Sequence, residues 1–202
     1  MSPMMDKQAA LQDFFDSYVS GRWQNDILLI DETYKQQKEQ IDSSFILAFD
    51  NACRLASELQ EQGLKGHTQY IYISLLRTSF MENTACYRID VYDNNWFLDQ
   101  EECFSLWEAD FIFHPLFDRR AALETQKTDY ARKVTSMDIE QMLLEEAELY
   151  HMLALAFMRS RVGELIQSHA YQEMSKHPNL CIFSGEYKDR SEILYGESGA
   201  DA

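Results

Sequence analysis

The sequence predicts a predominantly helical α+β protein, in which a helical bundle around a long apolar helix (about 137–174) packs with a small antiparallel sheet. Apolar residues recur at steps of three and four over most of the chain, which is the period of amphipathic helices. Two segments, about 70–92 and 180–195, change to a period of two with turn residues between their halves, as in β-hairpins. Only 7 Gly and 3 Pro occur in 202 residues, too few for the turns of an all-β fold.

The chain begins with an amphipathic helix. Its apolar stripe falls at positions i, i+3, i+4, i+7 and i+8, and consists of Leu11, Phe14, Phe15, Tyr18 and Val19. Gly21 follows at once and suits the C-terminal cap, because glycine adopts the left-handed backbone conformation readily.

A second helical pattern runs from about 25 to 62 without Gly or Pro and stops at Gly63, as in a Schellman motif. Its centre is nearly all polar and misses one apolar step at Gln37 or Lys38. The pattern is compatible with one long helix whose centre faces solvent. It is also compatible with two helices separated by a break near Asp42-Ser43-Ser44, where serine can cap the second helix. The usual length of helices in globular proteins slightly favours this second arrangement.

The first predicted hairpin has strands at about 70–76 and 87–92, which are rich in aromatic and β-branched residues. A turn is expected at 81–84, and a further turn at 93–95 followed by a short strand at 96–98. Asp99 and Glu102 then have the spacing of a capping box, which predicts a helix ending near His114 before Pro115.

Pro115 is expected to open the next helix, which runs toward Lys133. Thr135 and Asp138 give another cap signature ahead of the longest apolar pattern in the chain. Because apolar residues cover more than one face there, the helix at 137–174 is expected in the middle of the fold. We expect one globular domain over 1–196 and a frayed tail at 197–202.

The formal net charge of −16 is unevenly distributed. The 99–118 segment has six acids and no Lys or Arg, and 138–148 has five acids and no Lys or Arg. Between them, 119–133 carries five bases and two acids, a net +3. Acids at helix N-termini are stabilised by the helix dipole, and the basic segment can pair with either cluster, so internal pairing is the favoured interpretation. The alternatives are an acidic docking surface and a surface that mimics DNA.

A charge of this sign disfavours nucleic acid and anionic membranes as direct partners and is compatible with a basic protein surface. The leading hypothesis is a non-catalytic protein-binding module, such as an adaptor, regulatory subunit or inhibitor, that acts through an acidic, aromatic surface around 99–118. The expected partner-binding residues are Glu101, Glu102, Trp107, Glu108, Asp110, Phe111 and Phe113. A homodimer and a DNA-mimicking inhibitor stay open.

A metal-binding protein or metalloenzyme is the alternative from another class. Glu148 and His151 stand three residues apart on a helix, the spacing by which helical bundles hold carboxylate-bridged metal ions. Such sites use two copies of this motif, and the chain has one. A buried glutamate paired with tyrosine or arginine, beside a hydrogen-bonded core histidine, explains the pattern more simply.

Catalysis is not favoured, and no cofactor is expected. The chain has no Gly-x-Ser-x-Gly nucleophile motif and no glycine-rich nucleotide loop. Its four cysteines lack the spacing of a metal or redox motif and are interpreted as buried thiols in a reducing compartment. No signal-peptide pattern and no apolar stretch of about 20 residues occurs, so a cytoplasmic location is expected.

Overall fold

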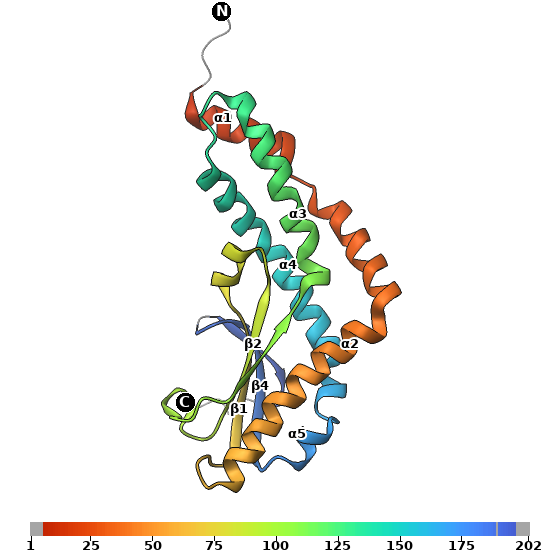
Figure 1. Cartoon of the computed structure of the whole chain (residues 1–202), viewed down its shortest axis with the longest axis vertical. Helices are drawn as coiled ribbons and strands as arrows, with labels where there is room; N and C mark the ends of the chain where they lie inside the picture. Colours follow the sequence, from red (N-terminus) through yellow and green to blue (C-terminus); the bar gives the residue numbers. More distant parts are fainter. Residues whose placement is uncertain (1–5, 189, 197–202) are drawn as a thin grey trace, which may run out of the picture. The chain divides into compact units, whose positions relative to one another are not determined.

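Helices and one mixed sheet make up the computed structural model, which describes residues 6–188 and 190–196 (Figure 1). The predicted α+β class with mainly helical content is confirmed. The chain divides into two compact units, the first from the ranges 1–36 and 110–153, the second from 37–109 and 154–202. The single domain over 1–196 stays a prediction, and the tail at 197–202 lies outside the described residues.

The first unit is helical. It comprises α1 (Lys7–Phe14), a π-helical turn (Phe15–Val19), the start of α2 (Trp23–Glu61), α3 (Asp110–Gln126), a 3-10 turn (Lys127–Tyr130) and the start of α4 (Ser136–Leu165). The amphipathic helix predicted at the beginning of the chain is present, and Gly21 after it has φ +73°. Its five-residue π-turn places Phe14 and Val19 on one face, and both are fully buried.

The second unit contains the sheet and the remaining helices. Its elements are the end of α2, β1 (Thr68–Leu75), a 3-10 helix (Arg77–Glu82), β2 (Cys86–Tyr92), a 3-10 turn (Trp96–Leu98), β3 (Phe104–Glu108), the end of α4, α5 (His169–Glu173), β4 (Lys176–Glu186) and β5 (Ser191–Tyr195). The strand order is β3-β2-β1-β4-β5. Both predicted hairpins are present, because β1 pairs antiparallel with β2, and β4 with β5.

The two hairpins meet through a parallel pair, so the prediction of a purely antiparallel sheet is wrong. β4 runs parallel to β1, with Ile71 opposite Ile182 and Ile73 opposite Ser184. A parallel pair requires a long crossover between its strands. Here, most of the helical sequence separates β1 from β4, so a local pattern could not reveal the pairing.

The two faces of the sheet differ in character. Helices α2 and α4 contact one face, where Cys103 bonds to the Ala52 carbonyl, Phe45 packs on Trp107, and Ser184 contacts Met158 (Figure 1). The opposite face, called the open face below, carries part-exposed side chains. They are Tyr70, Tyr72, Arg88, Tyr92, Phe104, Leu106 and Phe183.

Helix α2 is kinked at one non-helical residue, Gln37, which has φ −118° and ψ 21°. The irregularity lies where the apolar pattern misses a step, and the alternative of a break near Asp42-Ser43-Ser44 is wrong. Ser44 does not cap a new helix, because its hydroxyl donates to the Ile41 carbonyl inside α2. The predicted stop is confirmed at Gly63, which has φ +71°.

The segment from 96 to 114 differs from the prediction at two places. Trp96–Leu98 forms a 3-10 turn rather than a strand, and β3 (Phe104–Glu108) lies in the middle of the helix expected at 99–114. Asp99 does not cap a helix, because its carboxylate accepts the backbone N–H groups of Asp93 and Glu101. Helix α3 begins at Asp110 and continues through Pro115, so this proline opens no separate helix.

Helix α4 begins with the predicted cap, since Thr135 and Asp138 bond reciprocally through backbone and side chain. It ends at Leu165, and a separate short helix, α5, follows, so one helix over 137–174 is wrong. The helix is also not buried on all faces: Leu144 and Met152 are exposed, while Ala154 and Met158 are buried. The prediction of a long apolar helix is therefore not supported.

Candidate functional site

Two of the aromatic residues expected in the contact surface at 99–118 are buried. Trp107 and Phe113 are buried core residues of the second and the first unit respectively, so neither offers an anchor at the surface. The other expected contact residues differ in exposure. Glu102, Glu108 and Asp110 are exposed, whereas Glu101 and Phe111 are half-buried.

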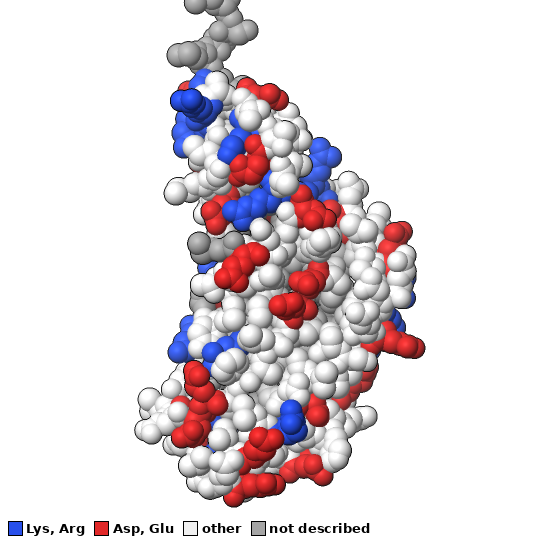
Figure 2. Space-filling view, viewed as in Figure 1, with Lys and Arg blue, Asp and Glu red and all other residues white. Residues whose placement is uncertain are grey.

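Internal pairing accounts for part of the acidic clusters. In the first unit, Arg119 of the basic segment lies 2.7 Å from Glu146 and 3.3 Å from Asp26, and it donates to the Tyr150 hydroxyl. In the second unit, Asp99 forms an ion pair with buried Lys65. On the face shown in Figure 2, acidic side chains stand in small separate groups rather than in a continuous row.

Glu148 and His151, the expected metal pair, differ in environment. Glu148 is exposed on α4, whereas His151 is buried. Among the described residues, no group of three or more histidine, cysteine, aspartate or glutamate side chains is placed to hold a metal ion. All four cysteines are buried as free thiols, and burial raises the pKa of Cys103 to about 12.

An aromatic cluster occupies the open face. Its members are Tyr70, Tyr72, Tyr92, Trp96, Phe97 and Phe183. Tyr72 is at its centre and stacks on Phe183 with a centroid distance of 4.7 Å, while Trp96 stacks on Phe97 at the same distance. Each such pair stabilises the folded protein by roughly 0.5–1.5 kcal/mol, in addition to the contribution of the apolar area that it buries. The cluster is therefore a built platform and not a set of unrelated surface rings.

The cluster ends in three consecutive apolar residues that solvent reaches. Trp96 is 42% exposed, Phe97 44% and Leu98 83%. Consecutive exposed apolar residues cost solubility unless they have a function, and contiguous patches of this kind mark contact sites on soluble proteins.

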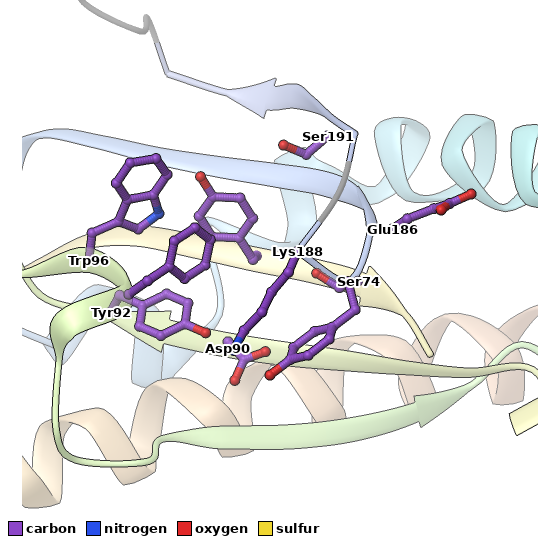
Figure 3. A pocket seen from close by; sticks show the side chains of 10 residues that line it. Ser74, Asp90, Tyr92, Trp96, Glu186, Lys188 and Ser191 are labelled. Carbon is purple, nitrogen blue, oxygen red and sulfur yellow. The ribbon is translucent and has the colours of Figure 1, made fainter. Parts of the chain in front are cut away.

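A cavity of about 340 Å³ adjoins this cluster, with Asp90 of β2 in its lining (Figure 3). Aromatic walls are supplied by Tyr72, Tyr92, Trp96, Phe97 and Tyr187. Asp90 is 2% exposed; its Oδ1 accepts from Arg88 Nε at 2.8 Å, whereas its buried Oδ2 has no partner among the described residues. Burial raises the pKa of the Asp90 carboxyl, and the hydrogen bond from Arg88 opposes this effect.

The β4–β5 turn supplies the other side of the cavity. Lys188, which has φ +56°, extends its side chain toward Asp90 in Figure 3. Its ammonium also lies 5.2 Å from the centroid of the Tyr187 ring, a cation–π distance. The Arg88 guanidinium also lies over the Phe104 ring, at 3.8 Å from its centroid.

Buried polar residues hold the loop that carries Trp96 and Phe97. Lys65, with no exposed side-chain surface, pairs with Asp99, whose side chain is 3% exposed. Asp93 accepts from the backbone of Asn95 at 2.8 Å and of Gly66 at 3.2 Å. The loop is thus fixed at both ends, and the aromatic platform is preorganised.

Sequence reasoning missed this site. The Trp96–Leu98 run was a visible signal, but its aromatic content suits a strand as well as a loop. Asp90 gave no signal, because a polar residue that alternates with apolar ones predicts a solvent-facing position. Tyr187 and Lys188, which line the cavity with Asp90, are remote from it in sequence.

The comparisons give no relative on which to base a function. No protein-family profile, no curated protein and no solved structure matches this chain. Within the described residues, no helix has the length and apolar character needed to cross a membrane.

Proposed function

We propose that this protein is a non-catalytic protein-binding module that contacts a partner with a basic surface through the open face of its sheet. The observation that carries the proposal is the exposed run Trp96–Leu98 at the edge of a preorganised aromatic cluster. Aromatic side chains in such clusters dominate the free energy of protein–protein contacts. The proposal keeps the class of function expected from the sequence and moves the contact surface away from 99–118.

Charge supports a basic partner. The chain carries −16 overall, and Asp90 in the lining of the cavity has a carboxylate oxygen that no described residue hydrogen-bonds. A positively charged partner is attracted over the range of a Debye length, about 8–10 Å at physiological salt. The contact then combines long-range attraction with apolar burial at the cluster.

The two alternatives are not favoured by any observation. Paired rows of acids, which DNA mimicry requires, are not visible on the face shown in Figure 2. Glu148 and His151 gain no third ligand among the described residues.

An array of short basic, neutral and acidic peptides tests the proposal. Labelled protein is compared with the variant Phe97→Ser/Leu98→Ser and with a control, Leu28→Ser/Leu29→Ser, which removes exposed apolar side chains from α2. We expect basic peptides to bind the wild type and the control, with affinity that falls as salt is raised. The variant Phe97→Ser/Leu98→Ser should bind the basic peptides about tenfold or more weakly than the wild type. Equal binding by both variants, or equal binding of acidic peptides, would contradict the proposal.

A further inference from the structure

The cavity beside the aromatic cluster has the features of a site for one side chain. Its volume, about 340 Å³, lies at the lower end of the range of about 300–1,000 Å³ found for ligand pockets. It is bounded by β1, β2, the loop at Trp96–Phe97 and the β4–β5 turn, all within the second unit.

One buried polar atom in this cavity has no partner. Asp90 Oδ2 is buried and accepts no hydrogen bond from the described residues, whereas Oδ1 is bonded to Arg88. A buried carboxylate oxygen without a donor is costly, because it has lost its hydration and gained nothing. A ligand that brings an N–H donor and a positive charge removes this cost.

The walls favour a cation for a second reason. The faces of aromatic rings carry partial negative charge, so rings around a small cavity attract ammonium groups. Tyr72, Tyr92 and Trp96 line this cavity together with Asp90. An anionic group would meet the carboxylate, and a neutral apolar group would leave Oδ2 unpaired.

The protein supplies an internal example of such a ligand. Lys188 belongs to the β4–β5 turn and extends toward Asp90 from the side opposite Trp96 (Figure 3). The two groups interact electrostatically, yet neither Lys188 nor any other described residue donates a hydrogen bond to Oδ2. Lys188 thus approaches the carboxylate without satisfying it.

From these observations we infer that the cavity binds a lysine side chain of the basic partner, with its ammonium donating to Asp90 Oδ2, and that Lys188 competes for this place. This inference rests on the proposed function and names the group that the open face recognises. A bound lysine displaces the Lys188 ammonium from the neighbourhood of Asp90. The binding is non-covalent, because no covalent bond forms or breaks.

Nuclear magnetic resonance with a short lysine-containing peptide tests the inference. The indole N–H resonance of Trp96, assigned with the variant Trp96→Phe, reports occupancy of the cavity. The same peptide is compared in three forms: unmodified, acetylated at the lysine, and trimethylated. The unmodified peptide should bind most tightly, because acetylation removes the charge and trimethylation removes the N–H donors.

Two variants separate the carboxylate from the competitor. Asp90→Asn keeps an acceptor for Arg88 and should lower the affinity for the unmodified peptide by about tenfold or more. Lys188→Met keeps the side-chain length without the charge and should strengthen binding by about threefold, since the competing state is removed. Lys188→Arg is the matched control and should leave the affinity near that of the wild type. The Lys188 variants alter an exposed turn, so they keep the test valid if Asp90→Asn does not fold.

The outcomes are distinct. Equal binding of the acetylated peptide, tighter binding of the trimethylated one, or no gain in Lys188→Met would overturn the inference. If all peptide forms bind equally but Phe97→Ser/Leu98→Ser loses them, the proposed function stands and the lysine site falls. If no form binds any variant, both fail. Tighter binding of free spermidine than of the peptide would assign the cavity to a soluble amine and would also overturn the inference.

Discussion

The ion pair between Lys65 and Asp99 gives the sharpest test of how the aromatic loop is held. Lys65→Met keeps the alkyl chain but removes the ammonium, in a place where the Lys65 side chain is 0% and the Asp99 side chain 3% exposed. Breaking a buried ion pair on one side costs about 3–5 kcal/mol, because the remaining charge is left without compensation. Asp99 keeps two backbone donors, from Asp93 and Glu101, so we expect the lower end, about 3 kcal/mol.

The measurement is hydrogen exchange of backbone amides in β1 and β2 under native conditions, together with urea unfolding. Exchange reports the second unit by itself, which matters in a chain with two compact units. The double variant Lys65→Met/Asp99→Asn removes the orphaned charge and should recover all but about 1 kcal/mol. Arg54→Met, which breaks an exposed pair with Glu58, is the control and should lose less than about 0.5 kcal/mol.

A loss below about 1 kcal/mol in Lys65→Met would refute the reasoning, since it would mean that Asp99 is stable without a cation. The same variant should broaden or shift the indole resonance of Trp96, because Asp99 anchors the loop that carries it. An unchanged resonance, combined with the expected loss of stability, would show that the loop is held by Asp93 instead.

Three further predictions follow from other contacts. In Gly185→Ala, the new Cβ would lie 2.0 Å from a carbonyl oxygen of the β4–β5 turn. The substitution should destabilise the hairpin by about 1–3 kcal/mol. The amides of β5 should therefore lose their protection from hydrogen exchange, while those of β1 stay protected. Arg119→Met should destabilise the first unit by about 3 kcal/mol in far-ultraviolet circular dichroism melts, because part-buried Asp26 and buried Glu146 lose their cation; a change within error would contradict this. Lysine-peptide binding should weaken on acidification with a midpoint above pH 3.8, since burial raises the pKa of Asp90 and its protonated form is neutral; a titration that is flat down to pH 4 would count against it.

Local signals explain what the sequence could predict of the fold. The reciprocal bonds of Thr135 and Asp138, the left-handed Gly63 and the two hairpins all lie between residues close in the chain. The parallel pairing of β1 with β4 is a contact between distant segments, which no local period encodes. Asp99 shows the difference most clearly: its spacing to Glu102 imitates a helix cap, but its carboxylate is bound by Lys65, 34 residues earlier.

The candidate site was beyond sequence reasoning for the same reason. Trp107 and Phe113 belong to a dense aromatic run, and density alone does not distinguish a core from a contact surface. The platform at Trp96 and Phe97 forms only because β1 places Tyr72 beside β4 and its Phe183. Asp90 shares its cavity with Lys188 of the β4–β5 turn, a residue remote from it in the sequence.

The central position of β1 and β4 has a consequence for synthesis on the ribosome. Strands β1, β2 and β3 form a meander once residue 108 has emerged, but the edge of β1 that β4 will cover stays unpaired until residues 176–186 follow. An exposed edge with Ile71, Ile73 and Leu75 is a template for pairing with another chain. Chains truncated before Lys176 should therefore aggregate, and the lysine cavity should be the last feature of the second unit to form during translation.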